Sequence, residues 1–130
     1  MFTTLSFSFN GISERKYIWK YFDVQKSLLY IKQWRVPLPV PKNIYVTFIT
    51  DKDYYIPDKI LKEPYFKKNP SKTLEELSQF LNFNEDFSSV VKYSKRNVDS
   101  TFIPTVYVPK FIFEDQMYPE SIQVVVKWVI

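Results

Sequence analysis

The sequence predicts a single α+β domain, spanning residues 1–130, that is dominated by antiparallel β-sheet. Aromatic residues make up 19% of the chain, and aromatic and β-branched side chains fit the pleated surface of a sheet. Several segments alternate apolar and polar residues as half-buried strands do, whereas two stretches near 13–34 and 73–96 have helical spacing. An all-β sandwich of the jelly-roll type is the alternative if residues 13–36 form strands instead.

The first predicted strand covers residues 2–9, where apolar positions 5, 7 and 9 alternate with threonine and serine. Asn10-Gly11 follows directly and is a strong short signal for a hairpin turn. A further strand is predicted over 43–50, which is rich in β-branched and aromatic residues.

Residues 13–35 are ambiguous. Tyr17, Tyr21, Val24, Leu28 and Ile31 recur at helical spacing, which favours a helix. The same stretch is rich in residues that prefer strands, so a pair of strands over about 16–24 and 28–36 is the alternative.

Proline occupies every second position in residues 36–41, so this segment is expected to be extended and unpaired. We interpret it as a rigid connector. A docking segment for a partner is the functional alternative, with Val36, Leu38 and Val40 as candidate interface residues.

Two short helices are predicted within 73–96, because Thr73 and Glu76 form a capping box ahead of an apolar stripe. The segment 74–84 resembles the first helix and turn of helix-turn-helix proteins, with Asn82 where glycine is usual. That resemblance implies a recognition helix that carries Lys92, Lys95 and Arg96 as nucleic-acid contacts. Two helices that simply pack on a sheet are the alternative.

The last third of the chain is predicted to be β-structure, with prolines that confine residues 101–114 to edges or bulges. Residues 121–130 form the strongest strand pattern, with apolar side chains on both faces. Such a strand is either central in its sheet or covered by a partner, so Trp128, Val129 and Ile130 are candidate interface residues.

Catalytic chemistry has little support in this composition. The chain has no His, no Cys and one Gly, which excludes thiolate or Ser-His-Asp nucleophiles, ordinary zinc sites and glycine-rich phosphate loops. Asp51, Asp53 and Glu114 are the only carboxylates to nominate, and nothing in the sequence brings them together. We therefore expect a protein that is not an enzyme, with no cofactor, metal or small-molecule ligand.

The formal net charge is +4, with lysine far more frequent than arginine. A lysine-rich segment over 51–72 surrounds aromatic residues, a combination that suits single-stranded nucleic acid, and Lys67 and Lys68 are candidate contacts. The sequence contains no apolar run long enough for a membrane span and no signal-peptide pattern at its start.

In its blend of Tyr, Ile, Val, Lys and Pro without Cys or His, the chain is similar to small proteins of viruses that infect hyperthermophilic archaea. That resemblance implies a virion component or a small regulator. We expect a structural or interaction protein, such as a minor capsid or assembly component, that binds protein partners or itself and resides in the virion or host cytoplasm. A helix-turn-helix regulator that binds DNA is the alternative.

Overall fold

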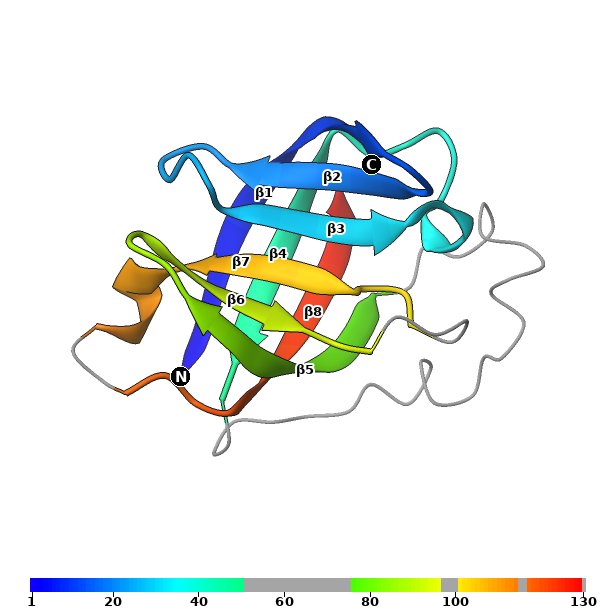
Figure 1. Ribbon diagram of the computed structural model, residues 1–130. Helices are drawn as coiled ribbons and strands as arrows, with labels where there is room; N and C mark the ends of the chain where they lie inside the picture. Colours follow the sequence, from blue (N-terminus) through cyan, green and yellow to red (C-terminus); the bar gives the residue numbers. More distant parts are fainter. Residues whose placement is uncertain (51–75, 97–100, 115–116, 130) are drawn as a thin grey trace.

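The structure, a computed structural model, describes residues 1–50, 76–96, 101–114 and 117–129 (Figure 1). Within these ranges eight strands close into one barrel in the order β1-β2-β3-β7-β6-β5-β8-β4. Neighbouring strands are antiparallel all round the barrel. The strands are β1 (Phe2–Ser13), β2 (Lys16–Tyr21), β3 (Leu28–Lys32), β4 (Asn43–Ile49), β5 (Leu77–Asp86), β6 (Val90–Ser94), β7 (Thr105–Pro109) and β8 (Ser121–Val129).

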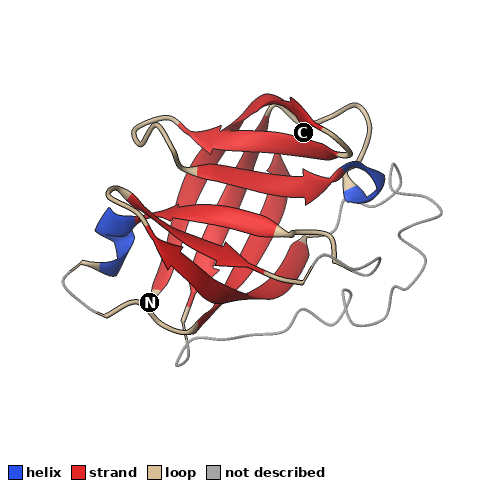
Figure 2. Ribbon diagram, in the orientation of Figure 1, coloured by secondary structure: helices blue, strands red, loops and turns tan. Residues whose placement is uncertain are grey.

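The predicted α+β class is therefore wrong. The helical segments of the described chain are short 3-10 turns, η1 (Gln33–Arg35) and η5 (Lys110–Phe113), and its other regular elements are all strands (Figure 2). The all-β alternative has the right class, but the strands close into a barrel instead of forming two packed sheets.

The two helices predicted within 73–96 are strands β5 and β6, and Thr73 of the expected capping box lies outside the described residues. Leu77 and Leu81 on β5 are fully buried, and Gln79 occupies the inward position between them. Because this inward residue is polar, the sequence of β5 lacks the alternation of apolar and polar residues that is typical of a strand. The apolar Phe80 points outward, and together with the leucines it produces the spacing of an apolar helix face. The resemblance to helix-turn-helix proteins has no helical counterpart in this segment.

The helix favoured for 13–34 is also absent, because these residues form β2, β3 and η1. Trp19, Leu29 and Ile31 are fully buried, and their direct neighbours along the two strands (Ile18, Lys20, Leu28, Tyr30 and Lys32) are partly exposed. Strand propensity therefore outweighs helical spacing in this stretch. The alternative of two strands over about 16–24 and 28–36 is correct, although the observed strands are shorter.

Asn10-Gly11 does not form the predicted turn. The register of β1 against β2 shifts between Phe9 and Gly11, so the chain passes through a bulge and continues to Ser13. Gly11 has a φ of +158°, a value that side chains rarely tolerate, which suits the only glycine of the sequence to this bulge. The reversal itself occurs at Glu14, whose φ is 52°.

The barrel interior is filled by side chains from every strand, as expected of an eight-stranded barrel of this size. Its largest fully buried apolar side chains include Phe7, Trp19, Phe48 and Tyr93. Trp19 donates its indole N–H to the carbonyl oxygen of Pro41 at 3.0 Å, so its one polar atom is paired.

Gln79 occupies an inward position of β5, between Leu77 and Leu81. Its amide nitrogen donates to the Ile103 carbonyl, and its amide oxygen accepts from the backbone N–H groups of Phe102, at 3.2 Å, and Ile103, at 3.1 Å. One side chain on β5 thereby fixes the segment that leads into β7, whose Ile103 is fully buried.

Candidate functional site

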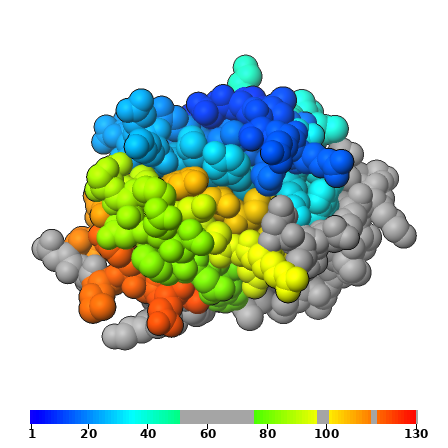
Figure 3. All heavy atoms as spheres, viewed as in Figure 1, coloured from blue at the N-terminus to red at the C-terminus, as the bar shows by residue number. Residues whose placement is uncertain are grey.

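The outer side of β2, β3, β7 and β6 carries a cluster of basic and aromatic residues, which we call the lysine–tyrosine face. These strands lie in front in Figure 1, and Figure 3 shows the same side as a surface. Because successive residues of a strand alternate between the two sides, the residues next to the buried ones point outward. The face consists of Lys16, Lys20, Tyr30, Lys32, Lys92 and Tyr107, all of them partly exposed.

The strand registers order these residues in rows across the sheet. In the row that contains Tyr107 of β7, Lys92 of β6 pairs directly with Tyr107. On the β3 side of Tyr107, Lys20 of β2 pairs with Leu28 of β3. Tyr30 pairs with Ile18 and with Thr105 in the neighbouring row. Lys16 and Lys32 pair with one another in the row after that. The two tyrosines therefore lie in the middle of the face, with lysines around them.

Tyr107 is fixed in place although the β3–β7 ladder is short. Its backbone carbonyl accepts a hydrogen bond of 2.9 Å from the hydroxyl of Ser27, whose side chain is fully buried. On the other side of the ladder the Lys32 N–H donates to the Phe102 carbonyl at 2.9 Å. These two bonds extend the seam between β3 and β7 and position the tyrosine rings.

The aromatic rings of the face form tilted pairs and are not stacked in parallel. The centroids of Tyr30 and Tyr107 are 6.3 Å apart at an interplanar angle of 58°. Phe87, in the β5–β6 turn, lies 6.1 Å from Tyr107, and the Lys92 ammonium lies 5.9 Å from the centre of the Tyr107 ring. Partial burial, with a smaller contribution from Tyr107, raises the pKa of the Tyr30 phenol, so this hydroxyl is protonated at neutral pH.

Two carboxylates moderate the positive charge. Glu14 approaches the Lys16 ammonium at 3.9 Å, and its side chain is 83% exposed, so the pair is weak. Glu85 is the cross-strand partner of Lys92 on β5. Among the described side chains of the face, four lysines therefore stand beside these two carboxylates.

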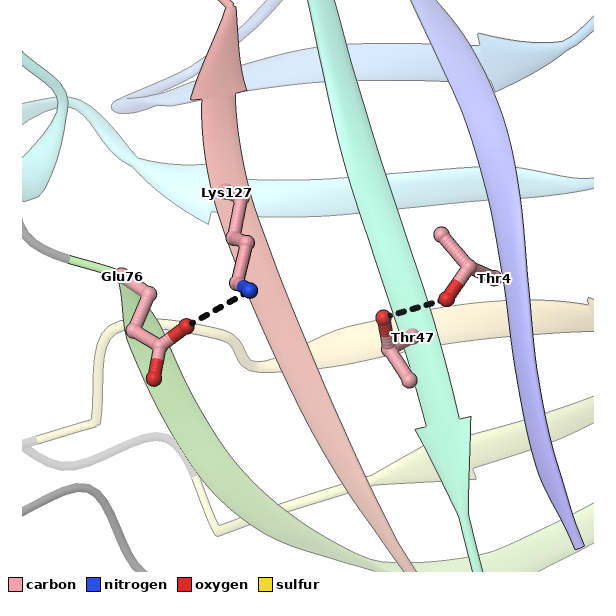
Figure 4. A network of polar contacts seen from close by, with 4 residues as sticks. All are labelled: Thr4, Thr47, Glu76 and Lys127. Atoms are coloured by element: carbon pink, nitrogen blue, oxygen red, sulfur yellow. Dashed lines mark hydrogen bonds and ion pairs between the residues drawn. The ribbon is translucent and has the colours of Figure 1, made fainter.

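The opposite side of the barrel has a different character. An open groove with a volume of ≈ 360 Å³, lined by Phe2, Thr4, Tyr45, Thr47 and Lys127, lies on β1, β4 and β8. The hydroxyls of Thr4 and Thr47 are 2.8 Å apart, and Lys127 forms an ion pair of 3.5 Å with Glu76 (Figure 4). This groove is lined by hydroxyls and balanced in charge, so its electrostatic attraction for a charged ligand is weak.

The nucleic-acid contacts predicted from the sequence are only partly brought together. Lys92 lies on the lysine–tyrosine face, whereas Lys95 and Arg96 are exposed just beyond the end of β6. Lys67 and Lys68 lie outside the described residues, as do Asp51 and Asp53.

The interface residues predicted from the sequence are dispersed. Val36 is fully buried, Val40 is partly buried against the core, and Leu38 is 59% exposed. Trp128 packs against the core with its ring 6.2 Å from Trp19, Val129 is partly buried, and Ile130 lies outside the described residues. Strand β8 pairs with β5 over Ser121–Val126 and with β4 over Gln123–Val129, so it has a neighbour on both sides, as every strand of the closed barrel does.

Sequence reasoning missed Tyr30 and Tyr107, which become neighbours only through the pairing of β3 with β7. The described residues contain no group of three or more Asp, Glu, His or Cys side chains that could hold a metal ion. In the part of the chain that the structure describes, no helix has the length and apolar character needed to cross a membrane.

Comparison of the sequence with protein-family models and with curated proteins finds no match.

Proposed function

We infer that this protein is a non-enzymatic binding protein that recognises a polyanionic partner on the lysine–tyrosine face. The observation that carries this proposal is the gathering of Lys16, Lys20, Lys32 and Lys92 around two partly exposed tyrosines on one side of the barrel. Clustered cations attract phosphate or sulfate groups and accelerate encounter with a charged partner. The sequence pI of about 9.1 agrees with such a role.

The manner of binding follows from barrel closure. The eight described strands leave no free sheet edge, so a partner has no open edge to which it could add a strand. The described strands therefore offer a partner the side chains of their outer faces, and the lysine–tyrosine face is more strongly charged than the groove on the opposite side. The non-enzymatic part of the proposal rests on the lack of His and Cys in the sequence.

A role as a virion or assembly component stays a prediction from composition. A binding protein for polyanions is compatible with it, and so is self-association through another surface. The face is the more specific hypothesis because named side chains can be changed one by one.

The experiment is retention on immobilised heparin as salt increases. Lys20→Gln combined with Lys92→Gln removes two charges from the face, while Lys42→Gln combined with Lys127→Gln removes two charges elsewhere and serves as the matched control. We expect the first pair to elute at clearly lower salt than the wild type and the control pair to elute close to it. Equal elution of both pairs, or a wild type that does not bind heparin in dilute buffer, would contradict the proposal.

A further inference from the structure

The lysine–tyrosine face combines two features that a simple polyanion does not need. Besides the lysines it offers two aromatic rings, and the pair is partly exposed instead of sealed into the core. Aromatic rings bind the flat faces of nucleic-acid bases, and this stacking is tolerant of sequence. The presence of rings among cations therefore points to a ligand with both phosphates and bases.

The spacing of the rings discriminates between single and double strands. Tyr30 and Tyr107 have centroids 6.3 Å apart and are tilted by 58°. Bases within one strand of a duplex rise by about 3.4 Å and remain parallel. Two tilted rings at this distance cannot each stack on one of two adjacent bases unless those bases unstack from one another. Bases unstack easily only in a strand that is not paired in a duplex.

The surroundings of the rings support the same ligand. Lys20 and Lys92 lie on either side of Tyr107 in its row of the sheet. Lys16 and Lys32 pair with one another two rows away, beyond the row that contains Tyr30. A nucleic-acid backbone that runs across the β-strands can place its phosphates near lysines on both sides of the tyrosines while its bases lie over the two rings. The described residues contribute no α-helix to this face that could enter a major groove, which is the usual route to reading a duplex.

We propose that the lysine–tyrosine face binds single-stranded nucleic acid, with bases stacked on Tyr30 and Tyr107 and phosphates held by the surrounding lysines. This inference rests on the proposed function and narrows its partner to one chemical class. Lysines contact phosphates as point charges, in contrast to the bidentate base contacts of arginine, so the binding tolerates any sequence. If all four lysines meet phosphates, the slope of log affinity against log salt is about −2.8, and Glu14 and Glu85 reduce its magnitude.

The test uses the full chain and fluorescence anisotropy with a labelled oligothymidylate of about 12 nucleotides, compared with its duplex with oligoadenylate. Four proteins are compared: the wild type, the double variant Tyr30→Leu with Tyr107→Leu, the double variant Tyr30→Phe with Tyr107→Phe, and the control Tyr45→Leu. Tyr45 is a 49% exposed tyrosine on the opposite side of the barrel. Circular dichroism and thermal unfolding establish that each variant is folded.

We expect the wild type to bind the single strand more tightly than the duplex. The leucine variant should lose roughly tenfold in affinity for each tyrosine, while the phenylalanine variant and Tyr45→Leu retain binding. Unchanged affinity of a folded leucine variant, or tighter binding of the duplex, overturns the inference. If heparin still binds in a lysine-dependent manner, the polyanion proposal survives that outcome. If the wild type binds neither heparin nor oligonucleotide, both fail.

Discussion

Gln79 offers a sharp test of how the barrel positions its functional face. Its amide makes three hydrogen bonds to backbone groups of Phe102 and Ile103, at the start of the segment that leads into β7. Gln79→Met keeps the length and approximate volume of the side chain but removes all three bonds. Because Ile103 is fully buried, its N–H and C=O groups cannot regain water. Each buried group left unsatisfied costs about 1–3 kcal/mol.

Summed over the two Ile103 groups and the partly exposed Phe102 N–H, the expected loss in free energy of unfolding is about 3 kcal/mol. That is a large share of the stability of a domain of this size. The assay is urea unfolding at equilibrium, which reports the midpoint and the slope separately. Gln25→Met is the control, because it makes the same exchange in an exposed turn and should change stability by less than about 0.5 kcal/mol. A loss below about 1 kcal/mol for Gln79→Met would refute the reasoning.

Three further changes probe other parts of the structure. Trp128→Ala should lower the free energy of unfolding by about 3 kcal/mol in urea titration, because its ring packs on Trp19, and an unchanged midpoint would contradict this packing. Tyr30 has a raised pKa, so the stability it contributes is present below about pH 10 and is lost as pH rises through that raised value. Tyr30→Phe should therefore lose less stability than the wild type between neutral and strongly alkaline pH, and parallel curves would be evidence against the shift. Hydrogen bonding with Asp86 raises the pKa of Lys110, so Asp86→Asn should lower the alkaline titration midpoint of the Lys110 side chain followed by NMR.

Strands marked by many β-branched and aromatic residues could be predicted from the sequence over 43–50 and 121–130, and the strand with a polar residue at an inward position could not. Residues 43–50 and 121–130 were assigned close to the observed β4 and β8. In β5 the inward Gln79 and outward Phe80 remove the alternation on which a strand prediction depends. Only the contact of Gln79 with Phe102 and Ile103, which is distant in the sequence, explains why a polar residue occupies that position.

The candidate site was still less accessible to sequence reasoning. Lys92 was identified, but for a helix that does not exist, and Tyr30 and Tyr107 carry no local signal that connects them. Their proximity arises because β7 returns beside β3 with Tyr30 paired to Thr105. Pairing between segments so far apart depends on closure of the whole barrel, which local propensity and periodicity do not encode.

The central claim is that single-stranded nucleic acid binds on the outer side of β2, β3, β7 and β6. The most direct measurement is a two-dimensional amide NMR titration of the full chain with oligothymidylate. We predict that the largest shift changes fall within Lys16–Tyr21, Leu28–Lys32, Val90–Ser94 and Thr105–Pro109. Changes concentrated on β1, β4 and β8, or no changes at saturating oligonucleotide, would contradict the account.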